Sequence, residues 1–89
     1  MTAVSKSTFY YNEFTLGASY SAFEKFEAQF DSLKIMVSSA SGDNCEFNTI
    51  NAGAEVHGKL LEGESETWDD FRVGGISVKG QGTVRVWAW

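Results

Sequence analysis

The chain has 89 residues, of which 43% are hydrophobic and 15% aromatic, and it carries a formal net charge of −5. This length accommodates one domain, the apolar content argues against intrinsic disorder, and the negative charge disfavours nucleic acid as a partner. The single cysteine, Cys45, excludes an intrachain disulfide. No apolar run approaches the roughly 18 residues of a membrane span, and the first residues, MTAVSKST, lack the apolar region of a secretory signal. We therefore expect neither export nor a membrane partner.

Short alternating runs separated by glycine, serine and asparagine predict an all-β fold, a small antiparallel β-sandwich of jelly-roll type. We expect residues 1–7 to form a polar N-terminal arm and residues 8–89 to form the single sandwich domain. Disorder of this arm in the isolated chain, with ordering by a partner, is one interpretation of its polar composition. The aromatic-rich residues 8–16 predict the first strand of the domain.

Residues 19–30 fit two structures, and both stay open on the sequence alone. Ser21 and Glu24 match a helix capping box, and Phe23, Phe26 and Phe30 share one helical face, which favours a short helix around residues 21–30. A strand broken by one bulge fits as well, because the surrounding segments are β-structured and the apolar residues alternate around one irregularity. The members of that alternation are Tyr20, Ala22, Phe26, Ala28 and Phe30.

Two hairpins are predicted in the middle of the chain. The run LKIMVS places Leu33, Ile35 and Val37 on one face, and the turn SASGDN leads into a second strand, CEFNTI. We therefore predict that residues 33–50 form a hairpin. The strand AEVHGKLL and residues 65–71, joined by the turn Glu-Gly-Glu, predict a second hairpin.

A third hairpin is predicted from residues 76–79 and 83–89, which flank the turn GQG. The register counted from this turn places five aliphatic side chains on one face, which we expect to complete the core. These residues are Ile76, Val78, Val84, Val86 and Ala88. The opposite face carries Arg85, Trp87 and Trp89 and needs a cover, either other strands of the same chain or another subunit.

Two indole side chains are expected to cover glycines on neighbouring strands, a known way of packing a sheet. The register of the second hairpin places Trp68 across from Gly58, and that of the third places Trp87 across from Gly75. The end of the chain is thus predicted to be a strand tied into the sheet.

Charge is distributed unevenly along the second half of the chain. Residues 62–70 contain five acidic residues and no basic one, whereas residues 72–89 contain three basic residues and no acidic one. This asymmetry is either a solvated face with a chance imbalance or a pair of complementary patches that meet between subunits. The candidate interface residues are Arg85, Trp87, Trp89, Lys79, Arg72, Glu62, Glu64 and Glu66.

The sequence contains no recognisable catalytic or metal-binding pattern, so we predict no catalytic residues, no metal and no cofactor. His57, the only histidine, falls in the middle of a predicted strand on its solvent-facing side. Asp69 and Asp70 are adjacent, and neighbouring strand residues point to opposite faces, so they do not form an acid–base pair. This inventory favours a protein that binds or assembles over an enzyme.

Two segments of the second half, VHGKLLEGES and ISVKGQGTVRVWAW, resemble small β-structured virion proteins of tailed bacteriophages. These include head decoration (cement) proteins and tail-associated proteins of similar length, and the resemblance covers residues 33–37 and 56–89. It implies a non-enzymatic β-sandwich that is made in the host cytoplasm and resides in the virion. Such a protein would self-associate as a homo-oligomer and bind larger capsid or tail subunits.

Two further functions stay open at this point. The first is a carbohydrate-binding module, for which Tyr10, Tyr11, Tyr20 and Trp68 are the candidate aromatic platform. The second is a small acidic inhibitor that mimics nucleic acid. It would use Glu62, Glu64 and Glu66, which project about 7 Å apart if they alternate along a strand.

Overall fold

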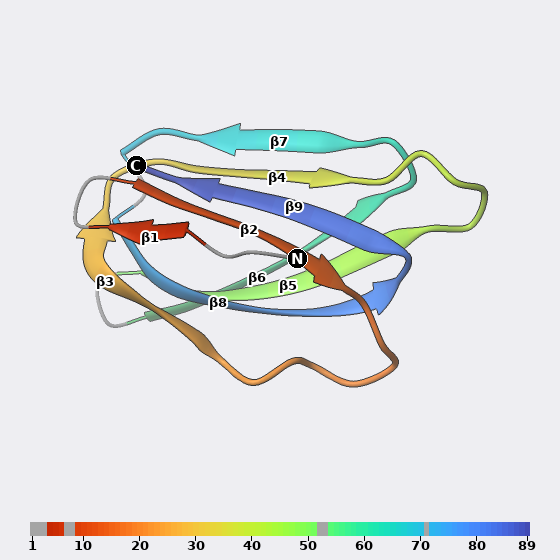
Figure 1. The fold of residues 1–89 in the computed structure, drawn as a ribbon, viewed down its shortest axis with the longest axis horizontal. Helices are drawn as coiled ribbons and strands as arrows, with labels where there is room; N and C mark the ends of the chain where they lie inside the picture. The colour runs from red at the N-terminus through yellow and green to blue at the C-terminus, as the bar shows by residue number, and fades with distance from the viewer. Residues whose placement is uncertain (1–3, 7–8, 52–53, 71) are drawn as a thin grey trace.

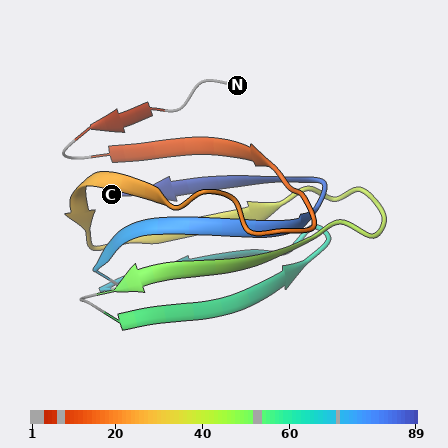
Figure 2. The same ribbon diagram turned by 90° about the horizontal axis from the view of Figure 1, so that it is seen from below.

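The computed structural model describes residues 4–6, 9–51, 54–70 and 72–89, and these residues form nine β-strands. The strands are β1 (Val4–Lys6), β2 (Phe9–Thr15), β3 (Glu24–Phe30), β4 (Leu33–Val37), β5 (Asn44–Asn51), β6 (Ala54–Leu61), β7 (Ser65–Trp68), β8 (Val73–Gln81) and β9 (Thr83–Ala88). They build two antiparallel sheets, sheet A in the order β1-β2-β9-β4-β7 and sheet B in the order β3-β8-β5-β6. The sheets pack as two layers (Figure 1 and Figure 2), which confirms the predicted all-β sandwich. No helix in the described part of the chain has the length and apolarity that crossing a membrane requires.

The core lies between the two sheets and is built by the alternating side chains that face inward from each. On sheet A, Leu33, Ile35 and Val37 of β4 are buried, and their neighbours on β9 are Ala88, Val86 and Val84. Sheet B contributes Cys45 and Phe47 of β5 and Ile76 and Val78 of β8. The five aliphatic residues predicted to share one apolar surface at the end of the chain are therefore all in the core.

The three predicted hairpins are wrong. In each case the second strand belongs to the other sheet: β4 lies in sheet A and β5 in sheet B, β6 in sheet B and β7 in sheet A, and β8 in sheet B and β9 in sheet A. The turns therefore carry the chain from one layer to the other. Gly80 and Gly82, with φ of 143° and 91°, provide the backbone conformation for the last of these crossings.

The error has a simple physical cause. In a hairpin, residues at matched distances from the turn point to the same side of one sheet. When the chain instead crosses between two facing sheets, the same residues point toward each other from opposite sides of the core. The alternation of apolar and polar residues is identical in the two arrangements, so Val78 and Val84 are buried in both.

The glycine positions are covered by aromatic residues other than the predicted ones. Gly58 of β6 pairs directly with Phe47 of β5, whose ring occupies the space that a β-carbon at position 58 would need. A β-carbon at Gly75 would lie 2.6 Å from Cε1 of Phe23. The expectation that Trp68 and Trp87 cover these glycines is wrong, because each tryptophan lies in sheet A and each glycine in sheet B.

The ambiguous stretch 19–30 contains a strand, β3, and the alternative of a short helix around residues 21–30 is wrong. The register against β8 shifts between Lys25 and Phe30, as expected for an irregular strand. Phe26 packs on Tyr10, with ring centroids 4.4 Å apart. Ser21 does not cap a helix: its backbone N–H donates to the Val78 carbonyl, and its hydroxyl accepts from the Val78 N–H. Contacts with β8 and the core thus override the local capping signal.

The first and the last strand both belong to sheet A. Val4–Lys6, within the predicted arm of residues 1–7, form β1 and pair with β2, whereas residues 1–3 and 7 lie outside the described residues. The division into an arm and a domain stays a prediction. At the other end, β9 lies between β2 and β4 (Figure 1), and the Trp89 N–H donates to the Ser32 carbonyl. The prediction that the chain ends in a strand tied into a sheet is confirmed.

Candidate functional site

The outer face of sheet A, which points away from sheet B, carries a stack of three side chains on neighbouring strands. Trp87 of β9 pairs in register with Tyr11 of β2 on one side and with Lys34 of β4 on the other. The ring centroids of Tyr11 and Trp87 are 5.4 Å apart, and the Lys34 Nζ lies 5.4 Å from the Trp87 ring centroid. These distances suit an aromatic pair and a cation–π contact. All three side chains are half-buried.

The next row on the same face is charged. Arg85 pairs in register with Glu13 and Met36, and its Nε lies 3.9 Å from the Glu13 Oε2. The Arg85 side chain is still 56% exposed, so this ion pair leaves more than half of the side-chain surface accessible to a partner. A shallow cavity of about 340 Å³ adjoins the row and is lined by Glu13, Met36, Val37, Ser38, Ser39, Gly63, Thr83 and Arg85. Polar and apolar groups are thus juxtaposed on this face.

Trp89 and Phe9 are exposed large apolar side chains, 44% and 38% exposed, at the end of the same sheet. The structure thus brings together Arg85 and Trp87 of the predicted interface. Trp89, the third tryptophan-face residue, follows two residues after Trp87. Lys34 and Met36 were missed, and Tyr11 was predicted only for the carbohydrate platform, because their proximity to β9 depends on pairings between strands distant in sequence. Their alternation with buried residues was the one signal that they face outward.

The remaining predicted interface residues lie elsewhere. Lys79 belongs to sheet B, where its Nζ is 3.9 Å from the Glu46 Oε2 and 4.9 Å from the Tyr20 ring centroid. Arg72 is exposed just before β8 and has a φ of 33°. Lys79 and Arg85 therefore point outward from different sheets and do not form one basic patch.

The three glutamates of the acidic segment do not form a regular row on one strand. Only Glu66 lies within β7, and Glu62 and Glu64 precede it in the crossing from β6. Each of the latter accepts a hydrogen bond from a backbone N–H, Glu62 from Gly42 at 2.9 Å and Glu64 from Leu61 at 2.6 Å. The even spacing that a nucleic-acid mimic requires is therefore absent from these three residues.

The four aromatic residues predicted as a carbohydrate platform do not share a surface. Tyr10 is fully buried and packs on Phe26, so it cannot contribute to an exposed platform. Tyr11 lies on the outer face of sheet A, Tyr20 contacts Lys79 beside sheet B, and Trp68 points between the sheets.

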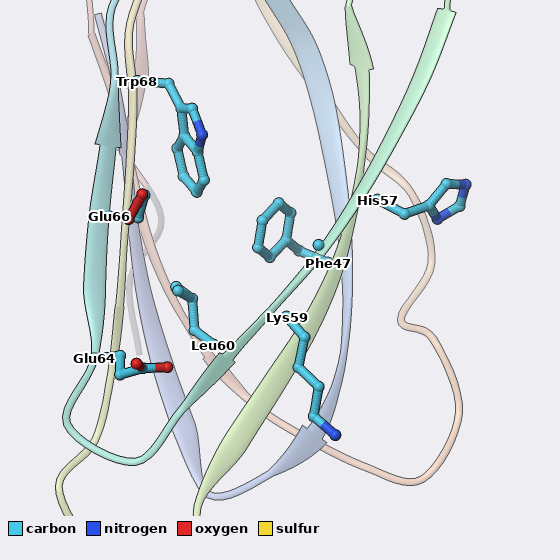
Figure 3. Close-up of a pocket in the computed structure, with 8 residues that line it drawn as sticks. Phe47, His57, Lys59, Leu60, Glu64, Glu66 and Trp68 are labelled. Carbon is cyan, nitrogen blue, oxygen red and sulfur yellow. The ribbon is translucent and has the colours of Figure 1, made fainter.

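A second cavity, of about 380 Å³, opens between the edge strands β6 and β7. Phe47, Gly58 and Leu60 line it from sheet B, while Glu64, Glu66 and Trp68 line it from the opposite side. The Trp68 and Phe47 rings point toward one another (Figure 3), with centroids 5.3 Å apart in an edge-on arrangement. His57 and Lys59 of β6 also border the cavity, but their side chains point away from it (Figure 3).

Two ionisable groups in the core are held in their neutral forms. Burial raises the pKa of the Cys45 thiol to about 12, which leaves it protonated and unreactive at neutral pH. Burial also raises the pKa of Tyr10 above its usual range, with a smaller contribution from the nearby Glu24 carboxylate. Within the ranges that the structure describes, no group of three or more His, Cys, Asp or Glu residues gathers as metal ligands would.

The two-sheet arrangement is that of a cupin-like jelly roll, and solved cupin structures share it. An RmlC-like cupin protein from Desulfovibrio desulfuricans is 17% identical, with a TM-score of 0.52 over 97% of this chain and 76% of that one. The cupin domain of Drosophila melanogaster CENP-C is 20% identical, with a TM-score of 0.51 over 93% of this chain and 59% of that one. The chain thus spans about three fifths of the CENP-C chain.

A third solved structure is similar in extent as well as in fold. The SPBc2 prophage-derived protein YomS is 14% identical, and the match covers 96% of this chain and 97% of that one with a TM-score of 0.56. At these identities the similarity establishes the fold. No family model and no curated protein matches the sequence.

Proposed function

We propose that this chain is a non-enzymatic structural protein of a bacteriophage particle, and that it self-associates through the outer face of sheet A. The observation that carries the proposal is the stack of Tyr11, Trp87 and Lys34 on that face. Sheet B packs on the other side of sheet A, so this aromatic and charged surface is open to a second molecule. Tryptophan, tyrosine and arginine are the residues most enriched at interface hot spots.

The phage assignment is supported by two independent similarities. The segments VHGKLLEGES and ISVKGQGTVRVWAW resemble small virion proteins of tailed phages. The fold, in turn, matches the prophage-derived YomS over nearly the full length of both chains. We propose that the protein is made in the host cytoplasm and resides in the virion, where its further partners are larger capsid or tail subunits.

The character of the surface favours a protein partner over nucleic acid or a membrane. Lys34 and Arg85 are cations on the outer face of sheet A, and Glu13 already lies beside Arg85. With a net charge of −5, the chain as a whole repels phosphate-bearing surfaces. A half-buried indole bordered by single charges instead suits an interface with an apolar centre and a polar rim.

The proposal is tested by measuring the association of variants in solution. Replacing Trp87 with serine removes the centre of the stack. Loss of a hot-spot side chain costs about 2 kcal/mol or more, so we expect the W87S variant to associate at least about 30-fold more weakly. Light scattering coupled to size-exclusion chromatography, repeated over a dilution series, measures this change.

The matched control is the I50S variant. Ile50 is an exposed apolar residue on β5 of sheet B, 40% exposed, so its replacement removes apolar surface from the other side of the molecule. We expect I50S to associate like the unmodified protein. Equal weakening by W87S and I50S, or an effect of neither, contradicts the assignment of the interface to sheet A. Urea unfolding of both variants separates lost association from lost folding.

A further inference from the structure

The cavity between β6 and β7 has an apolar interior and an acidic mouth. Phe47 and Leu60 are buried, with 3% and 8% exposure, and form one wall, and the half-buried Trp68 indole forms the facing wall. Glu64 and Glu66 are exposed and border the opening on the β7 side. Figure 3 shows the Glu64 carboxylate directed toward the space in front of Leu60.

The charged side chains that border the opening of this cavity, Glu64 and Glu66, are both acidic. The Lys59 ammonium and the His57 imidazole lie on the far side of β6, with their side chains directed outward (Figure 3). Lys79–Glu46 and Arg85–Glu13 are ion pairs in the part of the chain that the structure describes, and neither includes a carboxylate of the cavity. The Glu64 Oε1 accepts the Leu61 N–H, which fixes this side chain at the opening.

The polar groups select a ligand that donates hydrogen bonds. Carboxylates accept hydrogen bonds and donate none, so they suit an ammonium with three donors or a guanidinium with five. A cation beside the face of a tryptophan gains a further electrostatic attraction. Sugars, by contrast, offer hydroxyl groups that both donate and accept hydrogen bonds. The two carboxylates can accept from these hydroxyl groups but cannot donate to them.

We propose that the cavity between β6 and β7 binds a basic side chain, lysine or arginine, of a partner protein. The alkyl stem of the side chain would contact Phe47, Leu60 and Trp68, and its charged end would meet Glu64 and Glu66. The volume of about 380 Å³ is near the lower end of ligand pockets, about 300 Å³, which suits one side chain better than an extended ligand.

This proposal is separate from self-association through sheet A. None of the residues that line the cavity belongs to the Tyr11–Trp87–Lys34 stack or to the neighbouring Arg85 row. The two can therefore fail independently: the first is tested by the mass of the protein in solution, and the second by the binding of a small cationic probe.

The probe is ethylguanidinium, and ethylurea is its neutral counterpart of similar shape. Binding is followed by two-dimensional NMR through the indole N–H signal of Trp68, assigned by comparison with the W68F variant. We expect ethylguanidinium to shift the Trp68 signal with millimolar affinity, while the signals of Trp87 and Trp89 stay in place. Ethylurea is expected to leave all three signals unchanged.

Charge variants test the role of the carboxylates. The E64Q and E66Q substitutions keep the shape and an acceptor oxygen but remove the charge, and we expect each to weaken binding by about two- to fivefold. The E62Q variant is the matched control, because Glu62 lies in the same acidic segment but is bonded to Gly42 outside the cavity.

Four results would overturn the proposal. The first is an unmoved Trp68 signal at the highest soluble concentration of ethylguanidinium. Two others are equal binding of ethylurea and a shift produced by methyl glucoside, since each would show that charge does not select the ligand. The fourth is equal weakening by E62Q and E64Q, which would reduce the effect to the net charge of the segment.

Discussion

Two buried side chains, Tyr10 and Cys45, show how the core controls the ionisation of single residues. Both are 0% exposed, and burial favours their neutral forms. In the unfolded chain the tyrosine would ionise near its ordinary pKa of 10.0 and the thiol near 9.0. In the folded protein, burial raises the pKa of the Cys45 thiol to about 12 and also raises the pKa of the Tyr10 hydroxyl.

Stability should therefore fall in alkaline solution. Well below pH 9 both states keep both protons, and the contribution of these groups is fully present. Above that, the unfolded chain loses protons that the folded chain retains, so the free energy of unfolding decreases by up to about 1.4 kcal/mol per pH unit for each group. Urea unfolding between pH 8 and about pH 11 measures this slope.

The Y10F variant is the control for this prediction. It removes the ionisable hydroxyl and keeps the ring, so the decline above pH 10 should be smaller by the contribution of one group. Identical slopes for Y10F and the unmodified protein would show that Tyr10 is not the buried phenol described above.

Single residues were predicted well where alternation decides their side of a strand. Leu33, Ile35 and Val37 are buried as predicted, and Arg85 points outward. Tyr10 was misplaced among exposed aromatics next to Tyr11, although adjacent strand residues point to opposite faces. The composition of the strand could not show which of the two tyrosines faces the core, because that depends on β9, a neighbour in the sheet that is distant in sequence.

At the level of the strands, location was predictable and connection was not. Alternating apolar residues identify β4, β5 and β6 from the sequence, since the period of two is a local property. Whether a turn closes a hairpin or crosses between layers depends on which strands pair, and β9 pairs with β2 and β4, more than 40 residues earlier. The neighbours of Trp87 follow from these pairings and were therefore missed, and Trp68 is positioned by the equally unforeseen pairing of β7 with β4.

The Phe47–Gly58 pair offers a test of how β5 and β6 fit together. A β-carbon at position 58 would overlap the Phe47 ring, which is itself held in the core. We expect the G58A variant to be destabilised by about 1–3 kcal/mol, as in other overpacked cores. Urea unfolding at neutral pH provides the measurement.

Gly17 is the matched control for this substitution. Nothing lies within 4 Å of the β-carbon that alanine would add there, so we expect G17A to change the free energy of unfolding by less than about 0.5 kcal/mol. A G58A variant as stable as G17A would contradict the predicted overlap.

At the scale of the whole molecule, the acidic segment and two cations of sheet A lie on different surfaces. The acidic segment 62–70 follows the β7 edge of sheet A, whereas Lys34 and Arg85 lie on its outer face. If these surfaces meet between neighbouring copies, the contact is either reciprocal, in a two-fold dimer, or head-to-tail, in a ring or a filament.

Such an assembly should respond to salt. The Debye length falls from about 10 Å at 0.1 M salt to about 3 Å at 1 M, so attraction between exposed charges weakens over this range. The R85E variant should associate more weakly than the unmodified protein at low salt, and the difference should shrink at high salt. Sedimentation velocity over a salt series follows both effects. Association that is indifferent to salt and to R85E would indicate an apolar contact without charge complementarity.

The central claim, that the outer face of sheet A is an assembly surface, is tested most directly by the mass of the unmodified protein in solution. One chain has a mass of 9.8 kDa. We predict that light scattering on the purified protein gives a mass of two or more whole chains, and that the W87S substitution lowers this mass toward that of one chain. A mass of 9.8 kDa at the highest soluble concentration would contradict self-association.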